Sequence, residues 1–502
     1  MQTQNKTIKT KAAVFSDIKE QSVEADLILP DYYPDISKIL KCSVNPSTEA
    51  VTVSGDRISV AGAALIKLVF CGDDKSINVY ETQVKYTKVL QCSDIEATDI
   101  VDVMQTAGSL NYKALGPKRV EVRAVAVVKV NVHRLCEKTV LTDVNEKCIQ
   151  KHICEKKCFG LSSFLCGELN INENVKSASQ GTFKSVLQSN AAVSVEEIKP
   201  AKNKLMVRGK CAVATTYITE SGDVAVLSYP VPFTEICDAY AVSDDTKCFV
   251  GIKSADVFVS VKDNSEGSVS LDVNIKLPFV LLAGTDDEIM YIDDVYSVAQ
   301  DIDACFCKLD VLKAVTPCEG RLHRVFTADS YDENITEVCD AFVDDIRYSI
   351  EASSGNVKAT GSLNVNAVLK NTDGQFVVIT RTFAFEEALA IDAVSFGEGF
   401  ISLMCDSVSA SVNGGKVNFT VDMKYSGFVC SNDEQKMLYS IDFKEADSTQ
   451  PNENVVIYYA HSGEKLWDIA KENRSTVDKI SAVNNISSDV IRQDCVLVFP
   501  NF

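Results

Sequence analysis

The chain has 502 residues, too many for one hydrophobic core, so about three or four domains of roughly 100–200 residues are expected. Its residues are 46% hydrophobic and 24% charged with only 11 prolines, which excludes a disordered or collagen-like chain. The formal net charge of −20 repels phosphate backbones and anionic lipid, which argues against nucleic acid or a membrane surface as partner.

The N-terminal residues lack the features of a signal peptide. Lys6, Lys9 and Lys11 are not followed by the apolar stretch that such a peptide requires. Elsewhere no apolar run approaches the ~20 residues of a membrane span. The longest, 277–284, is interrupted by Pro278 and fits a buried strand. The sequence therefore predicts a cytoplasmic protein without a transmembrane segment.

A segment of the chain occurs three times, 147 and then 152 residues apart, which is a domain length. The copies align without a gap on Gly62, Gly209 and Gly361, and matched residues follow at offsets of 8, 13 and 24. These are Phe70, Tyr217 and Leu369, then Lys75, Gly222 and Gly374, then Tyr86, Phe233 and Phe385.

An apolar triplet with the i, i+3, i+4 spacing of one helix face begins 26 residues before each aligned glycine. The triplets are Ile36, Ile39 and Leu40; Phe183, Val186 and Leu187; and Ile335, Val338 and Cys339. Pro34 and Asp35 suit the start of a helix. The spacing predicts one short helix near the start of each copy.

The rest of each copy has the pattern of β-strands, with β-branched residues in rough alternation. Residues 220–223 and 371–374 are hairpin-turn sequences, and 267–282 and 414–430 predict further strands. The expected fold class is mainly β, with three sandwich-like or barrel-like repeat domains that contain short helices. The expected divisions are repeats at 14–150, 160–310 and 320–444, a polar linker at 445–455 and a C-terminal module at 456–500.

The eighteen cysteines are mostly scattered singly, as expected of small apolar residues in a reducing cytosol. One cluster between the first two copies contains Cys148, His152, Cys154, Cys158 and Cys166, whose side chains suit Zn²⁺. Its spacing matches no standard zinc motif, so no metal or other cofactor is predicted. Cys148, His152, Cys154 and Cys158 stay a weak zinc candidate.

No motif for catalysis is present. The P-loop, the G-x-S-x-G nucleophile turn and H-E-x-x-H are all missing, and the four histidines are far apart in the sequence. Acidic pairs such as Asp73 and Asp74 lie in turn-like contexts. The sequence predicts that the protein is not an enzyme; a site assembled between the β domains is the third alternative.

Residues 457–500 predict a βααβ module. Leu466, Ile469 and Ala470 recur at helical spacing beside Trp467, the only tryptophan of the chain. A second helix ends at Asn484 and Asn485, because asparagine tolerates the left-handed cap position. We expect a structural core rather than ligand contacts from Leu466, Trp467, Ile469, Ala470, Ile480, Leu497 and Pro500.

The module resembles the LysM domain. The matching residues are Tyr459, Gly463, Glu464, Leu466, Trp467, Ile469, Ala470, Asn484, Leu497, Val498 and Pro500. The resemblance implies a groove for N-acetylglucosamine-containing glycans between loops near 461–466 and 484–491. The implied binding residues are Ser462, Gly463, Glu464, Lys465, Asn484, Asn485 and Ile486.

The whole chain resembles the SPOCS-domain proteins of endospore-forming clostridia. The opening E-x-x-V-x-x-D-L-I-L-P-D-x-x-P-D-I-x-x-I-L at 20–40 carries this resemblance, with a signature best seen at Val207, Gly209, Tyr217, Gly222, Pro232 and Phe233. It implies a spore-envelope assembly protein in the mother cell, at the forespore surface. Its LysM module would dock onto the ATPase scaffold of the spore coat. The alternative is a cell-wall protein that binds peptidoglycan or N-acetylglucosamine glycan.

Overall fold

The computed structural model consists almost entirely of antiparallel β-sheet. It describes residues 2–176, 183–263, 269–329, 335–353, 356–391, 398–444 and 455–500. Most of the expected linker, 445–454, lies outside the described residues. Within these ranges neither of the two helices is long or apolar enough to span a membrane.

One order of strands occurs three times along the chain. In unit 1 a long first strand pairs with the last strand, and the three strands after the first form a separate meander, giving the sheets β1-β6-β5 and β2-β3-β4. The strands of unit 1 are β1 (Gln2–Ile28), β2 (Ile36–Ser54), β3 (Arg57–Gly72), β4 (Ile77–Gln91), β5 (Ile100–Gly116) and β6 (Arg119–Asn145).

Units 2 and 3 repeat this order, except that the fifth strand of unit 2 is split into β11 and β12, which both pair with β13. Unit 2 contains β7 (Ile149–Lys176), β8 (Phe183–Ala201), β9 (Lys204–Thr219), β10 (Val224–Asp238), β11 (Lys247–Ile252), β12 (Asp256–Asp263) and β13 (Val269–Ser297). Unit 3 contains β14 (Ile302–Asp329), β15 (Ile335–Ser353), β16 (Asn356–Asn371), β17 (Phe376–Leu389), β18 (Glu398–Asn413) and β19 (Lys416–Phe443).

The two sheets of each unit pack face to face around an apolar core, as in a β-sandwich. In unit 1 this core joins Leu27 of β1, Phe70 of β3 and Val122 of β6. The alternation of buried and exposed residues along β9 is that of a strand with one face on the core. The structure therefore confirms a mainly β fold of the sandwich type.

The aligned glycines are directly opposite the aligned aromatic residues on the neighbouring strand. Gly62 pairs with Tyr86, Gly209 with Phe233 and Gly361 with Phe385. A Cβ atom on Gly62 would lie 2.6 Å from the Tyr86 ring, so the ring occupies the space that glycine leaves. An aromatic side chain over a strand glycine shields the backbone and fixes the register.

The prediction of a short helix in each copy is wrong. Ile36, Phe183 and Ile335 are the first residues of strands β2, β8 and β15. Each of these strands contains two β-bulges close to its start, so that three residues oppose two on the partner strand at each bulge. For example, Ile36 pairs with Gly72 and Ile39 with Phe70. In a regular strand, residues on the same face are two apart. The extra residue at a bulge makes this separation three, which is also a separation between residues on one face of a helix.

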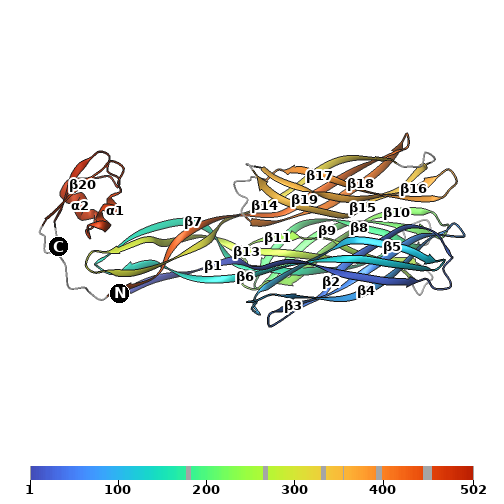
Figure 1. The fold of residues 1–502 in the computed structure, drawn as a ribbon, viewed down its shortest axis with the longest axis horizontal. Helices are drawn as coiled ribbons and strands as arrows, with labels where there is room; N and C mark the ends of the chain where they lie inside the picture. The colour runs from blue at the N-terminus through green and yellow to red at the C-terminus, as the bar shows by residue number, and fades with distance from the viewer. Residues whose placement is uncertain are drawn as a thin grey trace.

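The outer halves of the long strand pairs leave the sandwiches and form a narrow stalk (Figure 1). These pairs are β1·β6, β7·β13 and β14·β19, with 27 to 29 residues in each strand. A two-stranded ribbon cannot bury its own apolar face. All three units therefore contribute to shared clusters, one with Val140, Tyr291 and Met437 and another with Leu141, Ile292 and Leu438.

The three meanders also meet, at the wide end of the molecule. The shared cluster there contains equivalent residues of the three copies, namely Leu40, Leu187 and Cys339, and Ile77, Val224 and Phe376. Equivalent positions can meet only if the copies are arranged around a common axis. Lys41 of unit 1 forms a 2.6 Å ion pair with Asp344 of unit 3 at this junction.

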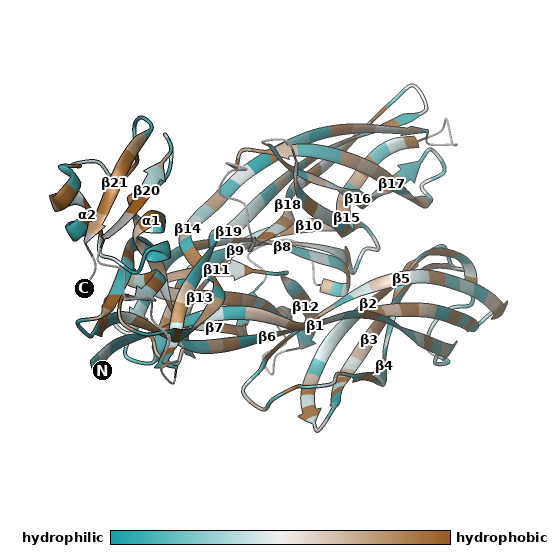
Figure 2. Ribbon diagram, turned by 60° about the vertical axis from the view of Figure 1, so that its left-hand side comes forward, coloured by the Kyte–Doolittle hydropathy of each residue, from teal (hydrophilic) through white to brown (hydrophobic). Residues whose placement is uncertain are grey.

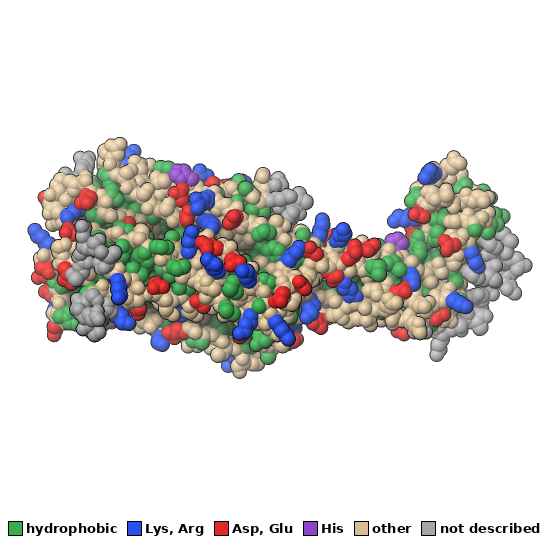
Figure 3. Space-filling view, turned by 180° about the vertical axis from the view of Figure 1, so that it is seen from behind, with side chains coloured by type: hydrophobic (Ala, Val, Ile, Leu, Met, Phe, Trp, Pro, Cys, Tyr) green, Lys and Arg blue, Asp and Glu red, His purple; other side chains and the backbone are tan. Residues whose placement is uncertain are grey.

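The C-terminal module lies against the tip of the stalk (Figure 3). It contains β20 (Val455–Ala460), α1 (Leu466–Glu472), α2 (Val477–Asn484) and β21 (Cys495–Pro500). Asn485 caps α2 with φ 53° and ψ 40°, in the left-handed region. The structure thus confirms the βααβ order and the asparagine cap.

A comparison of the copies predicts a stabilising substitution. Lys75 has φ 66°, whereas glycines at the same aligned position, Gly222 and Gly374, have φ 87° and 74°. A side chain in this region costs about 1–2 kcal/mol, partly offset by the greater backbone entropy of glycine. We expect Lys75→Gly to raise the midpoint of urea unfolding, followed by circular dichroism, and Gly222→Ala to lower it. An unchanged or lower midpoint for Lys75→Gly would contradict the argument.

Candidate functional site

The structure brings together the two loops of the C-terminal module that were expected to form a groove. Gly463 N–H donates to the Ile491 carbonyl at 2.8 Å, and Leu466 N–H donates to that of Asp489 at 2.9 Å. Lys465 forms an isolated bridge with Val490. These backbone groups therefore bond to each other across the two loops and are occupied before any ligand arrives.

The polar candidate side chains are also used within the module. Asn484 donates from Nδ2 to the carbonyls of Ile480 and Val498 and accepts through Oδ1 from Val498 N–H, at 2.8–3.0 Å. Glu464 accepts from the backbone N–H of His461 at 3.0 Å. Asn484 thus fixes the end of α2 to β21, which is a structural role.

The remaining candidate binding residues have local roles or face solvent. Ser462 donates twice within the loop: its backbone N–H donates to Asp494 Oδ1 and its hydroxyl to the Arg492 carbonyl, both at 2.9 Å. Ile486 N–H donates to the Ser481 carbonyl at 3.0 Å. Lys465 is exposed at the start of α1 and makes no side-chain capping bond.

The expected core residues of the module divide into two groups. Five of them are buried between the sheet and the helices, namely Leu466, Ile469, Ala470, Ile480 and Leu497. Trp467 is only partly buried and contacts the stalk. Pro500 pairs with Val455 at the end of β21.

Trp467 joins the module to unit 2. Its indole Nε1–H donates to Asp294 Oδ2 of β13 at 2.8 Å, and its ring meets the edge of Tyr296 at 4.9 Å between centroids. Lys471, one turn further along α1, forms a 2.6 Å ion pair with the same Asp294 carboxylate. One carboxylate thus receives hydrogen bonds from two residues of the helix.

Further contacts complete this junction. The buried Tyr296 hydroxyl donates to the Ser475 carbonyl at 2.9 Å, and Arg474 forms a 2.5 Å ion pair with Asp301. Burial raises the pKa of Asp294, but the hydrogen bonds from Lys471 and Trp467 outweigh burial and hold that pKa below its usual range. Nothing in the sequence pointed to Asp294 or Tyr296, which are far from Trp467 along the chain.

The outer face of the module's sheet is apolar and exposed. Strand alternation and the pairing of Ile457 with Val498 and of Tyr459 with Val496 put these four side chains on one face. Their exposed fractions are 61% for Ile457, 72% for Tyr459, 52% for Val496 and 38% for Val498. We call these four residues the outer patch; β21 is visibly apolar in Figure 2.

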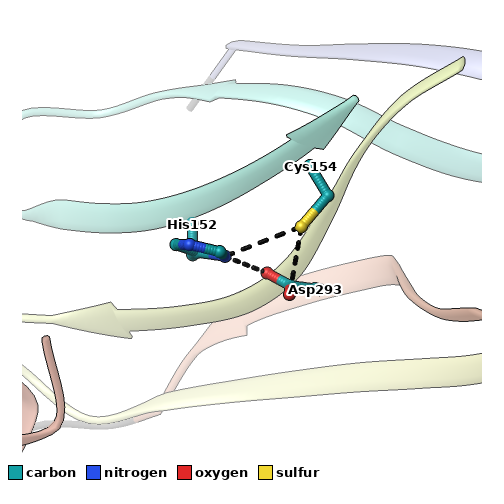
Figure 4. A group of neighbouring side chains, drawn as sticks. All are labelled: His152, Cys154 and Asp293. Atoms are coloured by element: carbon teal, nitrogen blue, oxygen red, sulfur yellow. Dashed lines mark hydrogen bonds and ion pairs between the residues drawn. The ribbon is translucent and has the colours of Figure 1, made fainter. Parts of the chain in front are cut away.

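A second group of functional side chains lies on the stalk beside the module (Figure 4). His152 Nδ1 lies 2.6 Å from Asp293 Oδ1, and Cys154 Sγ lies 3.2 Å from Asp293 Oδ2 and 3.8 Å from His152 Nδ1. Burial, followed by hydrogen bonding to Asp293, raises the pKa of the Cys154 thiol to about 11. The protonated thiol therefore donates to the carboxylate.

The other members of the cysteine-rich stretch do not join this group. Cys158 is buried in the stalk core, and Cys148 and Cys166 pack against other apolar clusters. The weak zinc candidate is thus divided: His152 and Cys154 come together, whereas Cys148 and Cys158 do not. The third member of the group is Asp293, which is far from His152 and Cys154 in the sequence and which their spacing could not predict.

The junction predicts that Asp294 controls the environment of Trp467. In Asp294→Ala the indole N–H and the Lys471 ammonium lose their shared acceptor, so the module should loosen from the stalk. We expect the emission of the single tryptophan to shift to longer wavelength, as it does when the ring enters water. Asp310→Ala on β14, at a carboxylate that accepts from Asn432, is the matched control, and an equal shift there would contradict a specific role of Asp294.

The lowered pKa of Asp294 sets the pH range of this contact. A carboxyl group with a lowered folded-state pKa contributes above its ordinary pKa of about 3.9 and loses that contribution as the pH falls through the folded value. We expect constant Trp467 emission from about pH 8 to about pH 5 and a red shift only near pH 4 or below. A red shift already near pH 6 would contradict control of this contact by the Asp294 carboxylate, whose pKa is lowered.

Comparison with known families identifies the domains of this chain. A family model described as SipL, SPOCS domain matches residues 35–115 and 183–262, and the LysM domain model matches residues 458–500. The SPOCS segments begin near the first meander strand of units 1 and 2 and include all three meander strands. No curated protein and no solved structure matches the chain.

Both families consist of binding or structural domains without catalytic chemistry, and a LysM domain suggests binding of glycan or peptidoglycan. The SPOCS domain suggests a role in sporulation. The chain therefore contains two segments that match the SPOCS domain and a C-terminal LysM domain, and in this combination it resembles SipL-like proteins.

Proposed function

We propose that the protein is a non-enzymatic assembly factor of the spore envelope. Its three units form a rigid scaffold, and its LysM domain docks onto the ATPase scaffold of the spore coat. On this proposal the protein works in the mother cell, at the forespore surface. The SPOCS and LysM matches support a sporulation role, and the apolar outer patch supports a protein as the ligand.

Unit 3 belongs to this proposal as a third SPOCS domain. It has the strand order of units 1 and 2, with a meander and a sheet built on the first and last strands. It also keeps the paired Gly361 and Phe385 at the aligned positions. The three SPOCS domains are proposed at 14–150, 160–310 and 320–444.

The observation that carries the docking proposal is the outer patch. Four apolar side chains lie side by side on a sheet face that carries no charged residue between them. Fully burying one such side chain contributes about 1.5–3 kcal/mol, so the patch can provide much of the free energy of a protein contact. A sugar ring, in contrast, requires polar partners for its hydroxyls, and the candidate groove uses its own polar groups internally.

The attachment of the module leaves this patch available. Trp467 and Lys471 on α1 face the stalk, while the inner face of the sheet, with Leu497 and Phe499, packs on the helices. The outer face is therefore on the side of the sheet away from the helices. The stalk and Asp294 hold the module in one orientation and so present the patch at the end of a long, stiff body.

A double substitution tests the proposal. Tyr459→Ser with Val496→Thr removes apolar surface from a cross-strand pair of the outer patch without touching the core. We expect at least about a tenfold loss of affinity for the purified coat-scaffold ATPase of the source organism, measured by surface plasmon resonance with the full-length chain. Val325→Thr, at a residue of β14 that is 59% exposed, is the matched control and should bind like the unchanged protein.

A second measurement separates the protein ligand from a glycan ligand. The same variants are incubated with insoluble peptidoglycan, and the bound fraction is determined by sedimentation. Retention of the unchanged chain on peptidoglycan without affinity for the ATPase would overturn the docking proposal and support the wall-binding alternative. Binding of the ATPase that the double substitution leaves intact would refute the outer patch as the docking surface.

A further inference from the structure

Three different donor atoms converge on the stalk beside the LysM module. They are an imidazole nitrogen, a thiol sulfur and a carboxylate, from His152, Cys154 and Asp293, and all lie within 4.8 Å of one another. His152 and Cys154 are two residues apart on β7, so their side chains share one face of the strand. Asp293 approaches from β13, the pairing partner of β7.

A β-bulge explains the position of Asp293. In the ladder between β7 and β13, Ile292 pairs with Ile153 and Asp294 pairs with His152, so Asp293 is the extra residue. A bulge re-aims side chains next to it. Here two successive carboxylates serve different partners: Asp294 accepts from Trp467 and Lys471, and Asp293 contacts His152 and Cys154.

We propose that His152, Cys154 and Asp293 form a binding site for Zn²⁺ with a fourth position open to solvent. Zinc binds nitrogen, sulfur and oxygen ligands at about 2.0–2.3 Å in a tetrahedron, which separates the ligand atoms by about 3.3–3.7 Å. Two of the three separations, 3.2 and 3.8 Å, lie close to this range. The third, 2.6 Å between His152 and Asp293, reaches it by a small side-chain rotation.

The charge balance of the site suits a divalent cation. The Cys154 S–H proton, now donated to Asp293, leaves to solvent as the Zn–S bond forms, and no electron is transferred. The resulting thiolate and the Asp293 carboxylate together offset the two charges of the metal. The side chain of His152 is 52% exposed, so the ion reaches the site directly from water.

The metal would cross-link the strands that hold the LysM module. Its ligands come from β7 and β13, and the His152 ring lies 5.6 Å from that of Trp467. Zinc therefore fixes the stalk tip directly beside the residue through which the module is attached. This role is independent of which partner the outer patch binds.

The single tryptophan provides a built-in probe for the test. The full-length chain, kept reduced and freed of metal by a chelator, is titrated with Zn²⁺ while the emission of Trp467 is followed. We expect a saturable change with one zinc per chain that a chelator reverses. Titration with Co²⁺ should produce the near-ultraviolet absorption of a thiolate-to-cobalt bond and the visible bands of a tetrahedral site.

Substitutions decide which residues hold the ion. Cys154→Ser should remove the thiolate-to-cobalt band and weaken Zn²⁺ binding at least about tenfold, and Asp293→Asn should weaken it as well. The chain offers a matched control in His323, whose Nδ1 lies 2.7 Å from Asp422 Oδ1, with Ser407 in the place of the cysteine. Neither His323→Ala nor Cys148→Ser should change the affinity.

Several results would overturn the proposal. One is a cobalt spectrum without a thiolate band, and another is equal zinc affinity in the unchanged protein and in Cys154→Ser. A loss of binding in Cys148→Ser with full binding in Cys154→Ser would move the metal to other cysteines. A circular dichroism spectrum of each variant shows whether it is folded, so that a loss of binding is not mistaken for unfolding.

Discussion

The pairing of the first strand of each unit with its last strand is the constraint on which the rest of the structure depends. In unit 1 this ladder runs from Gln2 opposite Asn145 to Ile28 opposite Arg119. Its inner half closes the sandwich over the meander. Its outer half continues as a ribbon that has no second sheet to cover it, and such a ribbon is unstable alone.

The three ribbons, one from each unit, bury their apolar faces against one another. Val140, Tyr291 and Met437, one from each unit, bury one another in the stalk, and ion pairs such as Lys6 with Asp287 at 2.8 Å connect neighbouring units at its surface. Because the units also share a cluster between their meanders, they are held at both ends. The three copies therefore pack into one body and are not separate domains joined by linkers.

The functional features are placed by this stalk. Near the tip of the stalk, a β-bulge in β13 directs Asp294 toward Trp467 and Asp293 toward His152 and Cys154. The LysM module is consequently attached through a helix face, and its apolar outer patch stays exposed. Trp467, which we expected in the module's core, packs against that core and also contacts Asp294 and Tyr296 of the stalk.

The sequence by itself determined the features that depend on the local chemistry of a segment or on a constant spacing between residues of the three copies. The repeat, the constant offset from each aligned glycine to an aromatic residue such as Gly62 to Tyr86, the asparagine cap at Asn485 and the βααβ order could all be predicted from the sequence. The prediction of a helix at Ile36 was wrong because β-bulges produce the same spacing of apolar residues as a helix. A bulge exists only relative to the partner strand, which the sequence of one segment does not specify. Tertiary structure alone decided the stalk, the contact of Trp467 with Asp294 and the selection of Asp293 over Cys148. These join residues more than a hundred positions apart, whose proximity depends on strand pairing and shared burial that no local pattern encodes.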